Sequence, residues 1–121
     1  MSWTIENTDQ FEAWWNALNE NEQVSVDASV RLLEEYGPAL PYPHSSAVRS
    51  SRHGVMRELR VQHAGRPFRV LYAFDPRRAV VLLLGGDKTG KRRWYEQSVP
   101  RADVIYEQHL TELRRSGEDN G

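Results

Sequence analysis

The sequence contains no cysteine, which excludes disulfide scaffolds, thiolate zinc sites and cysteine nucleophiles. It also lacks a long apolar stretch. The longest run covers residues 79–84, the length of a strand, whereas a membrane span needs about 18 residues. Its first residues have neither a basic start nor an apolar core, so they do not resemble a secretory signal. We therefore expect a cytoplasmic protein without a membrane segment.

What is present suits one small globular domain. The chain has 121 residues, of which 39% are hydrophobic and 27% are charged, as in ordinary soluble proteins. A chain of this length has room for a single domain. We expect that domain to cover residues 1–115, and residues 116–121, SGEDNG, to form a flexible tail.

The charge is unevenly distributed along the chain. The formal net charge is −1, but residues 1–43 carry −7, residues 44–101 carry +9 and residues 102–121 carry −3. A basic middle segment predicts a face that attracts polyanions, because each cation that meets a phosphate releases condensed counterions. The alternative is that the acidic segments neutralise the basic segment within the fold.

The N-terminal part predicts a short strand followed by two helices. Residues 2–6 favour a strand. Thr8 or Asp9 is expected to cap a first helix, and a second helix is expected from about Glu22 to Tyr36. Gly37 and Pro38 would end it. Residues 37–54 hold three prolines within six residues, so we predict an irregular connection there.

Three strands are expected next. Residues 55–63 alternate, with Leu59 and Val61 on one side and Glu58 and Arg60 on the other. Residues 68–74 alternate as well, with Arg69 on the side away from the aromatic residues. Residues 79–86 are mostly apolar, as in a strand buried on both faces. The short turns between these segments predict an antiparallel meander.

A last helix is expected from about Pro100 to Arg115, after a loop over residues 85–96. The predicted fold class is therefore α+β: an N-terminal strand and a helical hairpin packed on an antiparallel sheet, with a C-terminal helix. We expect the helices to lie on one face of that sheet.

Two sequence features are interpreted as structural rather than catalytic. The segment GGDKTGK, residues 85–91, matches the start of a phosphate-binding loop, but Arg92 stands where the motif needs Ser or Thr, so we interpret it as a coincidence that still suits an anion. The four histidines lack metal-ligand spacing, so no metal or other cofactor is predicted. His109 borders the apolar side of the last helix, and packing is its expected role.

Basic and aromatic residues from three elements form the candidate site. Arg60 and Arg69 lie on neighbouring strands between core-facing residues, so both should point away from the helices. A groove of guanidinium groups with aromatic edges suits single-stranded RNA, and the alternative is a solvated sheet face covered by charges. The cluster comprises Arg57, Arg60, Arg69, Lys88, Lys91, Arg92, Arg93, Trp94 and Tyr95.

The same residues carry a family resemblance. The chain resembles the HigB-like branch of the RelE/ParE toxin superfamily over about two thirds of its length, through ELR, FRVLYAFDP, LLLGGDKTG and WYE in this order. The resemblance implies a RelE-like fold and the toxin of a type II toxin–antitoxin pair. It implies a ribosome-dependent mRNA endoribonuclease that needs no metal, in which the RNA 2′-OH attacks the adjacent phosphate.

The resemblance also implies roles for individual residues. Arg69 would hold the scissile phosphate, Lys88 would stabilise the transition state, and Tyr95 would act as a base or stack on a base. To act as a base, Tyr95 would need a pKa below its usual value near ~10. The remaining members of the cluster would bind RNA: Arg57, Arg60, Lys91, Arg92, Arg93 and Trp94. RelE proper has two lysines on the strand before Arg69, where this chain has Met56 and Glu58.

The implied partners are mRNA, the 70S ribosomal A site and a cognate antitoxin of the helix-turn-helix type, through which the pair would bind its operator DNA. Two alternatives stay open. One is a ParE-like inhibitor of DNA gyrase without nuclease chemistry. The other is an inactive protein of the toxin fold that only binds its antitoxin. Arg69 and Tyr95 favour the nuclease, whereas Glu58 favours the alternatives.

Overall fold

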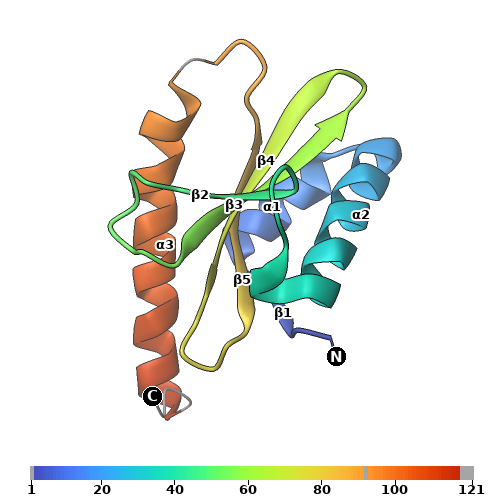
Figure 1. The fold of residues 1–121 in the computed structure, drawn as a ribbon. Helices are drawn as coiled ribbons and strands as arrows, with labels where there is room; N and C mark the ends of the chain where they lie inside the picture. Colours follow the sequence, from blue (N-terminus) through green and yellow to red (C-terminus); the bar gives the residue numbers. More distant parts are fainter. Residues whose placement is uncertain (1, 92, 118–121) are drawn as a thin grey trace.

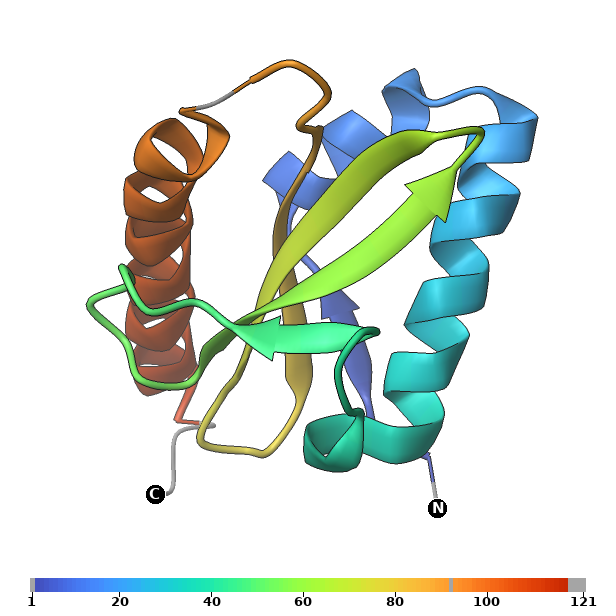
Figure 2. The ribbon, with the colours of Figure 1, turned by 45° about the horizontal axis from the view of Figure 1, so that its top comes forward.

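A computed structural model describes residues 2–91 and 93–117 of the chain. A five-stranded sheet of order β1-β5-β4-β3-β2 separates two helices on one face from a third on the other (Figures 1 and 2). The elements in chain order are β1 (Ile5–Asn7), α1 (Asp9–Ala17), α2 (Glu20–Tyr36), a 3-10 turn (Gly37–Ala39), β2 (Ser45–Ala47), β3 (Met56–His63), β4 (Arg66–Phe74), β5 (Val80–Asp87) and α3 (Trp94–Ser116).

The two N-terminal helices begin at side-chain caps. The Thr8 hydroxyl accepts the Phe11 N–H at 3.1 Å and so caps α1. Asn19 and Glu22 form a reciprocal capping box, which starts α2 two residues earlier than expected. Gly37 ends α2 at a φ of +54°, as predicted from the sequence.

The meander of β3, β4 and β5 is confirmed, but the whole sheet is mixed rather than antiparallel. Ala64 and Gly65, both at positive φ, make the tight turn between β3 and β4. β1 lies at the edge and runs parallel to β5, with Ile5 opposite Val80. This pairing joins segments far apart in the chain, so no local turn motif predicts that β1 and β5 are neighbours.

The expectation of an irregular connection over residues 37–54 was wrong at two points. Gly37–Ala39 form a 3-10 turn, and Ser45–Ala47 form β2, an edge strand antiparallel to β3. All three prolines lie before Ser45, so none of them removes a backbone donor from β2.

Two expectations about the last helix were also wrong. α3 begins at Trp94 rather than Pro100, and it covers the face of the sheet opposite to α1 and α2 (Figure 1). Pro100 removes one helical hydrogen bond. Burial of Trp94 and Val99 in the core under α3 holds the turns before it. No helix within the described residues is long and apolar enough to cross a membrane.

The sheet therefore has a hydrophobic core on each face. The first core joins α1 and α2 to residues such as Leu59, Val70 and Leu82. The second joins α3 to alternate strand residues such as Leu71 and Leu83. Because the two sets alternate along β4 and β5, these central strands are apolar on both sides, as predicted for β5.

Two neighbouring glycines in β5 admit a tryptophan on each face of the sheet. A Cβ at Gly85 would lie 2.1 Å from the Trp14 ring, and a Cβ at Gly86 would lie 2.4 Å from Trp94 Nε1. Trp14 comes from α1 and Trp94 from α3. The glycines of the GGDKTGK segment thus serve helix–sheet packing, and Gly86 places the start of α3 close to the end of β5.

Candidate functional site

The site is built around Arg69 at the middle of the sheet. Arg69 lies opposite Arg60 in the β3–β4 register. Both are on the face of the sheet against which α3 packs. Both arginines lie on the sheet face away from α1 and α2. The expectation that they point away from the helices was wrong for α3, which packs on the same face, and Arg69 is only 5% exposed. One of its guanidinium nitrogens donates to the Phe68 carbonyl at 2.9 Å. Arg69 is therefore a fixed, buried cation rather than a solvated surface charge.

Glu58 is the anion that compensates this charge. Its carboxylate lies 3.3 Å from Arg69 Nε and 3.6 Å from Arg60, and it accepts hydrogen bonds from Ser46 Oγ at 2.6 Å and Tyr95 Oη at 2.5 Å. With 7% of its surface exposed, Glu58 is itself buried. Buried carboxylates are stable when such partners surround them. Glu58 thus links β2, β3, β4 and α3 at one point.

Tyr95 reaches this point from the first turn of α3. Burial raises the pKa of its hydroxyl, the Glu58 carboxylate raises it further, and Arg69 opposes both effects only in part. The lowered pKa that Tyr95 would need to act as a base on its own is therefore not found. Tyr95 keeps its proton at neutral pH and donates a hydrogen bond to Glu58.

Lys88 completes the group at the end of β5. Its ammonium lies 5.3 Å from the centre of the Tyr95 ring, and its backbone N–H donates to the Pro67 carbonyl at 3.0 Å. We refer to Glu58, Arg60, Arg69, Lys88 and Tyr95 as the basic centre. The basic centre contains three cations and one carboxylate, so its net charge is positive and suits an anionic ligand.

Other members of the predicted cluster lie elsewhere. Arg57 is on the opposite face of the sheet, where it donates to Ser45 Oγ at 2.9 Å beside Tyr72. Alternation along β3 dictates this, because Arg57 differs by an odd number of positions from Arg60. Trp94 is 6% exposed against Gly86, so its indole is not available to stack on a base.

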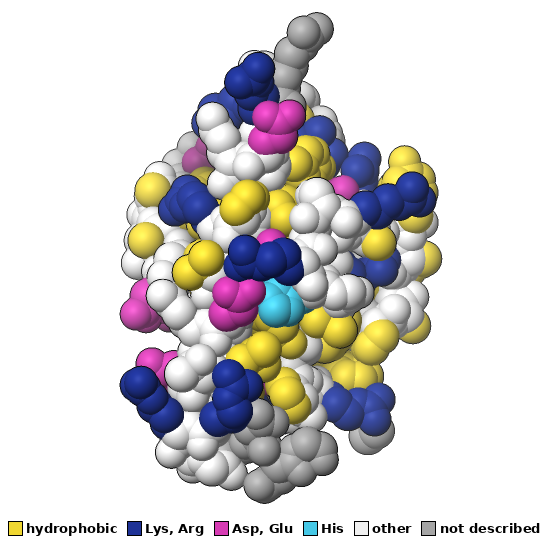
Figure 3. All heavy atoms as spheres, turned by 90° about the vertical axis from the view of Figure 1, so that its left-hand side faces the viewer, with side chains coloured by type: hydrophobic (Ala, Val, Ile, Leu, Met, Phe, Trp, Pro, Cys, Tyr) yellow, Lys and Arg dark blue, Asp and Glu magenta, His cyan; other side chains and the backbone are white. Residues whose placement is uncertain are grey.

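The loop after β5 supplies the exposed cations. Lys91 and Arg93 are exposed, and Arg93 forms a solvated ion pair with Glu96 at 3.8 Å. Arg92 lies outside the described residues. In the view onto α3, Lys and Arg side chains lie at both ends of this face, and acidic side chains lie among them (Figure 3). The loop therefore extends the positive charge of the basic centre to the surface.

Much of the remaining basic charge is neutralised within the fold. Arg66 pairs with Glu22 of α2, Arg77 with Glu6 of β1, and Arg52 with Glu107 of α3. The two interpretations of the uneven charge thus apply to different regions. Acidic segments neutralise the ends of the sheet, and positive charge persists near Arg69.

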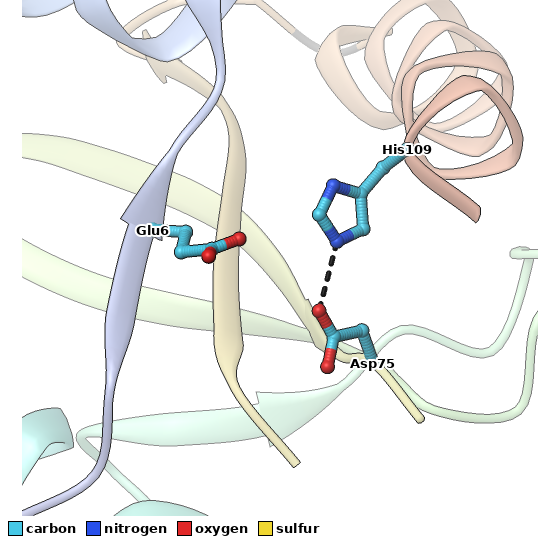
Figure 4. A group of neighbouring side chains, drawn as sticks. All are labelled: Glu6, Asp75 and His109. Carbon is cyan, nitrogen blue, oxygen red and sulfur yellow. Dashed lines mark hydrogen bonds and ion pairs between the residues drawn. The ribbon is translucent and has the colours of Figure 1, made fainter. Parts of the chain in front are cut away.

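A second polar group lies at the β4–β5 turn. Glu6, Asp75 and His109 bring possible ligand atoms within 4.8 Å of one another, and His109 Nε2 lies 2.8 Å from Asp75 (Figure 4). The Arg77 guanidinium bridges the two carboxylates, at 2.5 Å from Glu6 and 2.7 Å from Asp75. This group is an ion-pair network with its own cation, which opposes metal binding. His109 packs as expected, and the absence of a metal stays a prediction.

Burial by itself would raise the pKa of Asp75, but hydrogen bonds from Arg77, His109 and the Ala79 N–H outweigh it and hold the pKa below the usual 3.8. Asp75 is therefore ionised at neutral pH. It ties the turn between β4 and β5 to α3, far along the helix from Tyr95.

The sequence analysis noticed Glu58 only as a departure from RelE and missed its role. The signal was present, because Glu58 and Arg60 share a strand face and Arg69 lies on the next strand. An acid on that face is expected to pair with such cations. Ser46 was missed as well, since β2 was not predicted.

Comparisons with known proteins agree with this architecture. The profile of the family described as phage derived protein Gp49-like matches residues 13–107. The putative toxin HigB3 of Mycobacterium tuberculosis is 43% identical over 109 residues, which cover 89% of this chain and 94% of that protein. The putative toxin HigB2 of the same organism is 39% identical over 115 residues, covering 93% of this chain but 57% of that protein.

Among solved structures, a mutant of the Escherichia coli toxin RelE in the free state matches with a TM-score of 0.58. The match covers 84% of this chain and 98% of that one at 13% sequence identity, which shows a shared fold. The predicted α+β, RelE-like fold class is thereby confirmed. The family profile and the identities to both relatives show that the chain belongs to the Gp49-like, phage-derived family, the HigB-like branch of the RelE/ParE toxin superfamily.

Proposed function

We propose that the chain is the toxin of a toxin–antitoxin pair and that it cleaves mRNA in the ribosomal A site without a metal. The observation that carries this proposal is the contact of Arg69 and Tyr95 with one buried carboxylate, with Lys88 beside the Tyr95 ring. A phosphodiester at Arg69 would meet fixed positive charge, which stabilises the extra negative charge of a pentavalent phosphorane.

The hydrogen bond from Tyr95 to Glu58 supplies a route for the proton. The RNA 2′-oxygen attacks the adjacent phosphorus, and its proton passes to Tyr95 Oη while the phenolic proton passes to Glu58. The Glu58 carboxylate accepts the Tyr95 hydroxyl, and Tyr95 with its raised pKa is not a phenolate, so the two act as one base. The bond from phosphorus to the 5′-oxygen breaks, and Lys88 donates the proton that this oxygen needs. The products are a cyclic phosphate and a free 5′-OH.

The partners in this proposal are mRNA, the 70S ribosome and a cognate antitoxin of the helix-turn-helix type that neutralises the toxin and binds operator DNA. Action on translating ribosomes places the protein in the cytoplasm. The names of the relatives and the positive net charge of the basic centre support this proposal.

The experiment is cleavage of a defined mRNA on programmed 70S ribosomes, with free mRNA alongside and the 5′ ends mapped. The expected cuts fall in the A-site codon, require ribosomes and leave a 5′-OH. Cuts in free RNA as well would contradict the A-site proposal. If folded, antitoxin-free protein does not cut at all, the nuclease proposal fails, and a gyrase supercoiling assay tests the ParE-like alternative.

A further inference from the structure

A pocket of about 380 Å³ adjoins the basic centre at the free edge of β3. Arg60 and Arg69 line it together with residues of α2 and of the segment before β2, and no acidic residue is among those that line it. A larger pocket, of about 480 Å³ between β1, α1 and α2, is lined by Asp27 and Glu34 and by no member of the basic centre. Of these two pockets, the smaller one therefore combines positive charge with contact to Arg69.

The edge of β3 offers unpaired backbone groups in this pocket. β2 pairs with β3 only from Arg57 to Leu59, and the Arg60 N–H donates to the His44 carbonyl at 2.8 Å. Because backbone groups alternate in direction along a strand, the N–H and C=O of Gln62 point to the same edge as those of Arg60. Within the described residues no strand pairs with Gln62 on that side. Its exposed amide side chain adds a donor and an acceptor.

Tyr42 supplies an aromatic surface at the rim. It is 70% exposed, and its ring lies 5.3 Å from the Arg60 guanidinium carbon. Arg60 in turn lies 3.6 Å from Glu58. A chain of contacts thus runs from the exposed ring through Arg60 to the residues that hold Arg69 and Tyr95. Tyr42 is not among the lining residues, but its neighbour Pro43 and its contact Arg60 both line the pocket. An exposed ring beside a guanidinium group of such a pocket is suited to stack on a nucleobase.

We propose that this pocket is a base subsite in which Tyr42 stacks on a nucleobase next to the scissile phosphate and the Gln62 edge reads its hydrogen-bonding groups. The inference rests on the proposed function, because it needs an RNA phosphate at Arg69. It assigns codon preference to the segment before β2 and the end of β3, rather than to the cations of the 88–93 loop, which contact phosphates without regard to sequence.

The test measures kcat/KM of Tyr42→Ala on 70S ribosomes programmed with mRNAs that differ at one A-site nucleotide at a time. Stacking energies predict a loss of roughly tenfold or more on preferred codons and a smaller loss on the others, so that the preference flattens. Tyr42→Phe keeps the ring and should retain the wild-type pattern. Tyr36→Ala, which removes a 48%-exposed tyrosine outside the pocket, is the matched control. Gln62→Ala should alter the preference at the same nucleotide position.

An equal loss on every codon would show that Tyr42 contacts the ribosome rather than a base, and an unchanged preference in both Tyr42→Ala and Gln62→Ala would overturn the subsite. In either case the proposed function stands, since wild-type cleavage is retained. If the wild-type protein cuts none of the mRNAs, the proposed function and the subsite fail together. Thermal unfolding of each variant checks that a loss is not due to unfolding.

Discussion

The Tyr95 hydroxyl donates a 2.5 Å hydrogen bond to the Glu58 carboxylate, which lies 3.3 Å from Arg69 Nε. A phenol, a carboxylate and a guanidinium group therefore share one buried point on the sheet. The first three predictions concern what happens when one of them is changed.

Glu58→Gln is expected to lower the pKa of Tyr95. The carboxylate raises that pKa in the wild type, and a neutral amide removes both its charge and its preference for a protonated phenol. Ultraviolet titration of the phenolate band measures the shift. Subtracting the titration curve of the Tyr95→Phe variant isolates the signal of Tyr95 from those of the other tyrosines, of which the chain has five in all. A Tyr95 titration that stays in place, or moves to higher pH, contradicts the proposed contact.

The same substitution is expected to slow A-site cleavage by roughly 10²–10⁴-fold, since the proton relay loses its acceptor. The decisive readout is kcat at saturating ribosomes, because Glu58 is buried and should not change substrate affinity by direct contact. A variant that binds programmed ribosomes normally and cuts at the wild-type rate would remove Glu58 from the chemistry.

Arg69→Ala is expected to reduce cleavage by roughly 10²–10³-fold, the range found when one preorganised stabiliser of transition-state charge is removed. The matched control is Arg101→Ala, which removes an exposed arginine from α3. Single-turnover cleavage by both variants, with folding checked by circular dichroism, gives the comparison. Equal activity of the two would assign Arg69 to structure alone.

The sequence was sufficient for those features that depend on neighbouring residues. The alternation around Arg69, the tight turn at residues 64–65 and the cap at Thr8 are local, and the structure has them where they were predicted. The parallel pairing of β1 with β5 and the covering of the second face by α3 depend on contacts distant in the chain. No local pattern specifies such contacts.

The same division holds for the site. Residue types alone grouped Arg69, Lys88 and Tyr95, which the structure brings together. They also grouped Arg57 and Trp94, which the structure separates by strand alternation and by burial against Gly86. Glu58 was interpreted only as a departure from RelE that favours the alternatives. Its partners come from β2, β4 and α3, of which β2 was not predicted and α3 was predicted to start later than it does.

Gly86→Ala is expected to destabilise the fold by about 1–3 kcal/mol, since the new methyl group would overlap the Trp94 ring. Gly54→Ala is the control, because nothing lies within 4 Å of a Cβ there. Urea unfolding followed by tryptophan fluorescence gives the difference in free energy of unfolding. Similar midpoints for the two variants would show that Trp94 does not depend on Gly86.

The Asp75 network predicts an acid-labile contribution to stability. The pKa of Asp75 is lowered in the folded state, so its contribution is full well above the unfolded value of 3.8 and is lost as the pH falls through the lower, folded value. Asp75→Asn should lose about 3 kcal/mol at neutral pH, because it removes the buried negative charge that the Arg77 guanidinium and the His109 ring contact.

Urea unfolding of wild type and Asp75→Asn across this acid range tests the sign, since their difference in free energy must shrink as the pH falls. Asp27→Asn is the control, because its exposed pair with Arg31 is expected to be worth at most ~1 kcal/mol. A difference that grows toward low pH would contradict the assignment.

The position of Tyr95 in α3 has a consequence for the protein's own synthesis. Glu58 and Arg69 are translated before their phenolic partner and before the helix that covers the second core. β1 likewise cannot pair with β5 until β5 has been translated, some seventy residues later. A nascent chain thus carries an incomplete centre until α3 has been translated. Vectorial synthesis therefore delays assembly of this centre until α3 has left the ribosome.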